Sequence, residues 1–130
     1  MPRRSSPASA STSPAKSLSE TEFTRRVIKL ARLNGWRVLH IRPGRTIRKD
    51  PATGEVKTDW RTPIQGDGKG FPDLLMLRDD RMVVAELKVG KGKKTPEQVA
   101  WLQAFVLAGV QDVFTWFPGE WEEIEAILRR

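Results

Sequence analysis

The stretch Gly70–Lys88 reads GFPDLLMLRDDRMVVAELK and predicts two short apolar strands joined by a polar turn. We expect the strands at residues 74–77 and 82–87, because apolar and β-branched residues dominate both runs. The intervening Arg-Asp-Asp-Arg, residues 78–81, suits a turn, since aspartate tolerates the backbone conformations that turns require. The stretch therefore predicts a hairpin that is apolar along most of its length.

An antiparallel pairing across this turn gives the same register for a two-residue and a four-residue loop. Asp73 then faces Glu86, and directly opposed residues have Cβ atoms about 4.5–5.5 Å apart on one face of a sheet. Lys88 lies on that face as well, about 6.5–7 Å further along the strand. The same register pairs Leu75 with Val84 and Leu77 with Met82. The pattern thus gathers two carboxylates and an ammonium at one end of the hairpin.

Two interpretations of this polar cluster remain open from the spacing. Two facing carboxylates repel each other and raise each other's pKa, and a divalent cation such as Mg²⁺ relieves the repulsion while leaving sites for water and phosphate. Lys88 could then hold a nucleophilic water or neutralise charge on a phosphate. Alternatively, Glu86 and Lys88 form an ion pair at the end of a strand and Asp73 caps a turn, since structural ion pairs also make such clusters.

These residues carry a family resemblance. Pro72-Asp73, a gap of twelve residues, and Glu86-Leu87-Lys88 resemble the PD-(D/E)XK nuclease signature. The surrounding context, with Gly68–Leu74, Ala85–Lys88 and Thr95-Pro96-Glu97-Gln98 followed by Trp101, resembles the virus-type replication-repair nuclease domain (VRR-NUC). An early glutamate in an upstream helix belongs to the same pattern, and Glu22 occupies that place. The resemblance covers about residues 19–117.

The resemblance implies a fold, a set of site residues and a cofactor. The fold would be α/β, with a restriction-endonuclease-like αβββαβ core whose mixed sheet is flanked by helices. The cofactor would be Mg²⁺ or Mn²⁺, and Glu22 would bind it directly or through water. The implied catalytic residues are Asp73, Glu86, Lys88, Glu22 and Gln98, and the implied metal ligands are Asp73, Glu86, the backbone carbonyl of Leu87, and Glu22.

The function that follows is a metal-dependent DNA endonuclease acting in replication, recombination or repair. Small free-standing members of the family resemble junction resolvases and work as dimers, so we expect a homodimer that selects branched DNA by its shape. A non-catalytic DNA-binding module with the same fold is one alternative, and a metal-dependent RNase is another. The expected location is the cytoplasm of a bacterial or phage-infected cell.

The composition agrees with a nucleic-acid partner. The chain has 130 residues, a net charge of +7 and a pI near 10.2, and such a balance favours a polyanion. It contains no cysteine, which excludes disulfides and thiolate metal sites. No apolar run approaches the roughly 18 residues of a transmembrane helix, so we expect a soluble protein without a membrane partner.

The remaining elements follow from local patterns. Residues 1–17 are rich in Ser, Pro and Ala with three basic residues and no acid, which predicts a disordered basic tail before a single VRR-NUC-like nuclease domain over 18–130. Turn residues at 50–54 predict a protruding hairpin, basic on its first arm. Helices are expected from Ser19 to Gly35, from Thr95 to Gly109 and over 120–128, and further strands over 36–41 and 111–117.

Glu22 and Gln98 each have two explanations. Ser19-x-x-Glu22 and Thr95-x-x-Gln98 both fit a capping box, in which a side chain at the third helical position accepts a hydrogen bond from the N-cap backbone. The resemblance instead places both side chains close to the active site. The sequence leaves a role in the cap and a role in the site open for both residues.

Several basic residues are candidates for contact with the DNA backbone. A glycine-rich loop carries four lysines within seven residues beginning at Lys88, a pattern typical of contact that is independent of base sequence. The alternative for each of these segments is a solvated surface. His40, the only histidine, is given no catalytic role. The candidates are Lys69, Lys91, Lys93 and Lys94 near the expected site, and Arg45, Arg48 and Lys49 on the protruding hairpin.

Overall fold

The computed structural model describes residues 18–41, 44–61 and 66–130, with the side chains of residues 44–48 and 57–61 excepted. The predicted tail over residues 1–17 lies outside the described residues. The elements follow the expected order of helix, strand, hairpin, two strands, helix, strand and helix. They are α1 (Glu20–Leu33), β2 (Arg37–His40), β3 (Gly44–Lys49), β4 (Val56–Arg61), β5 (Leu74–Arg78), β6 (Arg81–Leu87), α2 (Pro96–Leu107), β7 (Asp112–Trp116), a 3₁₀ turn η1 (Pro118–Glu120) and α3 (Trp121–Arg129).

The protein is α/β, with a mixed four-stranded sheet in the order β2-β5-β6-β7. β5 pairs antiparallel with both β2 and β6, whereas β6 and β7 are parallel. The predicted register is confirmed, because Leu75 pairs with Val84 and Leu77 with Met82. The strands close through a two-residue turn in which Asp79 adopts a positive φ of 53°, a conformation that aspartate tolerates better than most residues.

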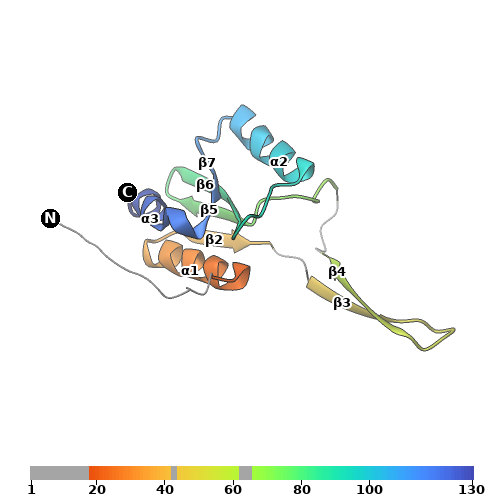
Figure 1. Cartoon of the computed structure of the whole chain (residues 1–130). Helices are drawn as coiled ribbons and strands as arrows, with labels where there is room; N and C mark the ends of the chain where they lie inside the picture. The colour runs from red at the N-terminus through yellow and green to blue at the C-terminus, as the bar shows by residue number, and fades with distance from the viewer. Residues whose placement is uncertain (1–17, 42–43, 62–65) are drawn as a thin grey trace.

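Helices cover both faces of the sheet. Figure 1 shows α1 and α3 on one side and α2 on the other, and α1 contacts β2, β6 and α3. The side chains of Phe23, Val27 and Leu30 on α1 follow helical spacing and pack against the sheet. The core between sheet and helices also contains Leu74, Met76, Val83, Ala85, Leu87, Trp116, Ile124 and Leu128, each almost fully buried.

Two arginines at the turn of the β5–β6 hairpin bind the C-terminal residues. The guanidinium groups of Arg78 and Arg81 lie 4.4 and 4.9 Å from the ring centroid of Trp36. Arg78 donates hydrogen bonds to the backbone carbonyls of Asn34 (2.8 Å), Leu128 (3.0 Å) and Arg130. The indole N–H of Trp36 also donates to the Leu128 carbonyl, at 2.8 Å. These bonds satisfy carbonyls at two helix ends, which have no partner within their own helix.

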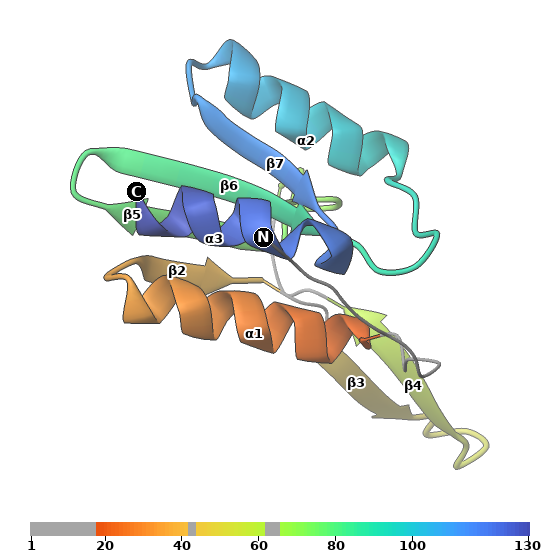
Figure 2. The same cartoon turned by 60° about the vertical axis from the view of Figure 1, so that its left-hand side comes forward.

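The predicted basic hairpin is confirmed as β3 and β4. The strands pair antiparallel from Gly44 with Arg61 to Lys49 with Val56, and Asp50 begins the turn by accepting the N–H of Ala52 at 2.8 Å. Figure 2 shows this two-stranded arm extending away from the four-stranded sheet.

One expectation about α2 holds only in part, since Val99 and Phe105 of its apolar stripe are half-buried and Val106 is exposed. An apolar stripe of Val99, Leu102, Phe105 and Val106 predicts one buried face, but Leu102 alone among the α2 residues is buried, and Val106 is 58% exposed. Leu107 on the same helix is 88% exposed. The helix is apolar almost all round, so its sequence does not define which face is buried, and it contacts the sheet at the edge strand β7. None of the described helices combines the length and the hydropathy needed to cross a membrane.

Candidate active site

The open end of the β5–β6 hairpin brings Asp73, Glu86 and Lys88 together as predicted. The N–H of Asp73 donates to Glu86 Oε1 at 3.2 Å, and the N–H of Leu87 donates to Asp73 Oδ2 at 2.8 Å. Each carboxylate is therefore held by the backbone of the other's segment. Lys88 Nζ lies 3.3 Å from Glu86 Oε2, and both side chains are largely buried. The predicted proximity of the three groups is confirmed. The Glu86–Lys88 ion pair, which was one of the two interpretations of the cluster, is also present.

Glu86 is the most unusual residue of this cluster. It is 1% exposed, whereas glutamate is almost never fully buried without a partner. Burial raises the pKa of Glu86 to about 7, with the neighbouring Asp73 carboxylate as the second cause, and the Lys88 ammonium offsets part of the effect. Lys88 thus pairs with Glu86, the Asp73 carboxylate lies close by, and negative charge at Glu86 is unfavourable in this structure.

The chain before Asp73 is held in place by tight packing against α2. Gly70 has a φ of 82°, and a Cβ at this position would lie 2.6 Å from the Cβ of Glu97. Phe71 packs edge-on against Trp101, with ring centroids 4.9 Å apart, and the Trp101 indole N–H donates to the carbonyl of Asp67 at 2.9 Å. Only glycine allows the chain to pass this close to α2, so Gly70 helps to fix the position of the loop that precedes Asp73.

The residues present fit a hard divalent cation. Magnesium binds to one or two protein carboxylates and completes its shell with water and substrate phosphate, and Asp73 and Glu86 supply two carboxylates. Burial, and then the Asp73 carboxylate, raise the pKa of Glu86, so its ionised form is unfavourable without a cation, and a bound cation would offset this cost. The backbone carbonyl of Leu87, which the resemblance implies as a further ligand, stays a prediction.

Glu22 and Gln98 lie in capping boxes. Ser19 donates to Glu22 Oε1 through its N–H (3.3 Å) and its hydroxyl (3.1 Å), and these bonds, the backbone one first, lower the pKa of Glu22. Thr95 N–H donates to Gln98 Oε1 at 2.9 Å. Within the described residues no three His, Asp or Glu side chains gather closely enough to bind a metal together, so Glu22 does not join the two carboxylates here.

Gln98 lies against the chain segment that leads to the site, as judged by its backbone. A Cβ on Gly70 would lie 2.8 Å from the N of Gln98, which places the first turn of α2 directly against the residues that precede Asp73. Gln98 therefore both caps α2 and lies next to the segment that precedes Asp73.

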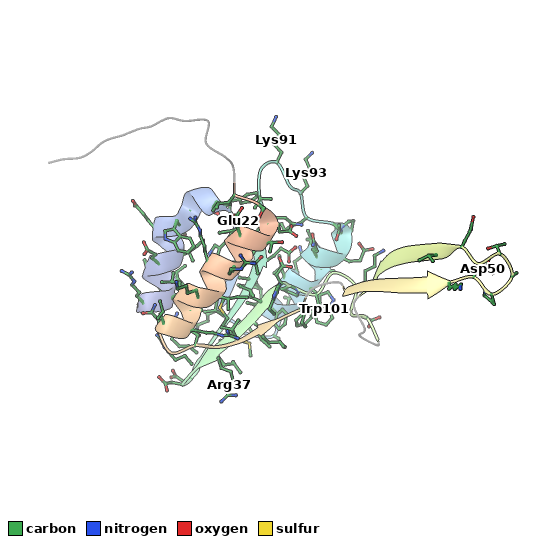
Figure 3. The ribbon with its side chains drawn as sticks, turned by 90° about the horizontal axis from the view of Figure 1, so that it is seen from below. Glu22, Arg37, Asp50, Lys91, Lys93 and Trp101 are labelled. Atoms are coloured by element: carbon green, nitrogen blue, oxygen red, sulfur yellow. The ribbon has the colours of Figure 1, made fainter. Side chains whose placement is uncertain are left out.

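The candidate contacts to the nucleic-acid backbone differ in their surroundings. Lys91, Lys93 and Lys94 are exposed, and Figure 3 shows Lys91 and Lys93 projecting on the same side of the molecule as Glu22. Lys69 lies 3.8 Å from Glu97 in an exposed pair of the kind that contributes little to stability. Lys49 on the hairpin is exposed, and the side chains of Arg45 and Arg48 lie outside the described residues.

The sequence did not indicate that Asp73 also borders a groove along α1. This groove is lined by residues of one flank of the helix, by His40 of β2 and by Asp73. The signal that could have found it is the spacing of the basic residues on α1, which places several cations on one side of the helix.

Comparison of the chain with protein families, with curated proteins and with solved structures finds no significant match.

Proposed function

We propose that this protein is a metal-dependent nuclease that hydrolyses phosphodiester bonds in DNA, built on a restriction-endonuclease-like core. The observation that carries the proposal is the convergence of Asp73, Glu86 and Lys88 at the open end of the hairpin, with Glu86 almost fully buried. The mixed sheet flanked by helices is compatible with that core, and the net charge of +7 favours a polyanionic substrate.

The proximity of Asp73, Glu86 and Lys88 supports the following roles, and the resemblance supplies the role of Leu87. Asp73 and Glu86 would hold Mg²⁺ or Mn²⁺, and the Leu87 carbonyl would add a ligand. When bound, such a cation stabilises charge on the phosphate and lowers the pKa of water. The Lys88 ammonium, 3.3 Å from Glu86 Oε2, would donate hydrogen bonds that orient the attacking water and would neutralise charge on the phosphate. Hydrolysis forms a bond from the water oxygen to phosphorus and releases the sugar oxygen, which ends up protonated.

We further propose that the enzyme is a homodimer that selects branched DNA. One chain carries one such cluster among its described residues, and symmetric cutting of two strands at a junction needs two sites related by a two-fold axis. Sedimentation of the protein with and without a four-way junction measures this directly.

A non-catalytic DNA-binding module is the second candidate, and specific observations favour it. Lys88 is already paired with Glu86, and the Glu22 and Gln98 side chains are already engaged in caps, so each has a structural role without chemistry. Such a module would bind DNA equally well after Asp73 is neutralised.

One assay separates these candidates. Purified protein is incubated with Mg²⁺, Mn²⁺ or EDTA and labelled duplex, flap, splayed-arm, four-way-junction and single-stranded DNA, together with single-stranded RNA of the same sequence. We expect cutting of branched DNA that requires the metal. Binding without cutting under all conditions would favour the binding module, and cutting of RNA alone would favour an RNase.

The lysine loop is expected to contribute affinity and not chemistry. Changing Lys91, Lys93 and Lys94 together to alanine should weaken binding to all DNA sequences and reduce the slope of log K against log salt by about 0.9 for each phosphate that the loop neutralises. The cleavage rate at saturating protein should stay within a few-fold of wild type. Arg37→Ala, at the opposite end of the molecule in Figure 3, is the control. An unchanged salt slope in the triple variant would place the loop away from DNA.

Glu22→Gln separates the cap from a role in the site. Glutamine can still accept the Ser19 N–H, so the melting temperature should stay close to that of wild type. Because Glu22 does not join Asp73 and Glu86 directly within the described residues, any contribution to the metal would pass through water. Glutamine lacks the negative charge that a hard cation prefers, so for such a role we expect a loss of cleavage at limiting Mg²⁺, partly recovered at high Mn²⁺. If the variant cuts at the wild-type rate under limiting Mg²⁺, Glu22 is a cap alone and the site rests on Asp73 and Glu86.

A further inference from the structure

A groove of about 860 Å³ runs along one flank of α1 and reaches Asp73. Its wall on the helix side extends from Glu20 to Leu33, a span of about 20 Å at the rise of an α-helix. The other side includes His40 at the end of the edge strand β2. Figure 2 shows α1 and β2 running alongside each other, with the chain reversing direction between them. The groove is therefore an open channel at the edge of the sheet, with Asp73 in its lining.

Three cations line this channel from the helix side. Arg25, Lys29 and Arg32 follow a spacing of four and three residues, which keeps them on one side of α1. All three are exposed, because the residues that α1 packs against the sheet occupy the opposite positions of the helical repeat. The first and last cations lie about 10 Å apart along the helix axis.

The charged groups of these three side chains are not held in close ion pairs within the described part of the chain. No described carboxylate lies within 4 Å of the charged nitrogens of Arg25, Lys29 or Arg32. The two acids in the lining are Glu20, at the start of the helix, and Asp73. A channel lined by such cations and bordered by the candidate metal site suits a ligand that carries regularly spaced negative charge.

We propose that this groove binds the phosphate backbone of a nucleic-acid strand and leads it to Asp73. Phosphates follow one another about every 3.4 Å along the axis of a duplex strand, so a row of three cations about 10 Å long spans about three steps between successive phosphates. This inference deepens the proposed nuclease function and rests on it for the role of Asp73. It adds Arg25, Lys29 and Arg32 as substrate-binding residues that position the strand.

The first test compares two variants with the same loss of charge. One changes Arg25, Lys29 and Arg32 to glutamine; the control changes three exposed arginines outside the groove lining, Arg26, Arg37 and Arg129. Binding to labelled DNA is measured in EDTA at several salt concentrations. The groove variant should lose about 2 to 3 units of salt slope, at about 0.7–0.9 for each phosphate neutralised, and the control less than one unit. Equal losses in the two variants would overturn the inference.

The second test uses the absence of cysteine in the chain. A single cysteine is introduced at Leu33, which lines the groove and is 75% exposed, or at Leu107, which is 88% exposed and does not line it. Each variant is incubated with DNA that carries a disulfide-activated tether on one phosphate. We expect Leu33→Cys to form the cross-link at least tenfold faster than Leu107→Cys. Equal rates would show that the strand does not follow this groove.

The two proposals fail in different ways. If wild-type protein cuts DNA but the groove variant has the salt slope of its control and Leu33→Cys does not cross-link preferentially, the groove inference fails and the nuclease stands. If no metal supports cutting, but the slope and the cross-link behave as expected, the groove is a nucleic-acid site and the catalytic proposal fails.

Discussion

Asp73→Asn is expected to lower the single-turnover rate of DNA cleavage by at least about 10²–10³-fold, the effect of removing one preorganised electrostatic group from an active site. The fold should survive, because an asparagine side chain retains an oxygen that can accept the Leu87 N–H now bound at 2.8 Å. Since the substitution removes charge and little else, the loss would report the carboxylate itself.

The matched control for this change is Asp80→Asn. Asp80→Asn is the same chemical change as Asp73→Asn. Asp80 is exposed in the turn at the other end of the β5–β6 hairpin, so it is remote from Glu86 and Lys88. Cleavage by Asp80→Asn should equal that of wild type. If Asp73→Asn cuts at the wild-type rate while its melting temperature is unchanged, the site assignment is wrong.

Glu86→Gln is expected to stabilise the metal-free protein at neutral and alkaline pH. The pKa of Glu86 is raised from 4.5 to about 7 in the folded state, so between these values the unfolded chain ionises while the folded chain retains its proton. The folded state then binds more protons than the unfolded state, and the free energy of unfolding falls as the pH rises from about 4.5 to 7. One pKa unit corresponds to about 1.4 kcal/mol, so the difference between 4.5 and about 7 limits the loss to about 3–4 kcal/mol.

Glutamine imitates the protonated glutamate without titrating. The difference in unfolding free energy between Glu86→Gln and wild type should therefore grow by about 1–3 kcal/mol from pH 4.5 to pH 8. Urea unfolding in EDTA at several pH values measures it. An exposed carboxylate of α3 provides the control, since Glu122→Gln should change stability by less than about 0.5 kcal/mol. A difference that does not grow with pH would contradict the expectation.

Bound metal should reverse the order of stability, so that wild-type protein becomes more stable than Glu86→Gln. A cation that binds only the folded wild-type protein stabilises it by mass action, by about 2.7 kcal/mol at one hundred times its dissociation constant. Glu86→Gln should gain less from the same concentration of Mg²⁺. A stabilisation by Mg²⁺ that is equal in both proteins would mean that Glu86 does not hold the metal.

The sequence alone was enough to predict the β5–β6 hairpin and the cluster at its open end. Side chains alternate along a strand, so the polar turn and the apolar runs select one register, and that register carries Asp73 opposite Glu86. The capping boxes at Ser19 and Thr95 were predictable for the same reason, because each depends on residues three positions apart. The physical cause in both cases is local geometry.

Only the tertiary structure decided which other residues meet at this cluster and how strongly they are buried. The apolar sequence of α2 does not choose a face, so the exposure of Val106 and Leu107 follows from how little of the helix the edge strand β7 covers. The burial of Glu86 depends on strands and helices from distant parts of the chain. The groove that joins α1 to Asp73 likewise arises where a helix, an edge strand and the hairpin converge, and no short-range spacing encodes the distance between elements that only packing brings together.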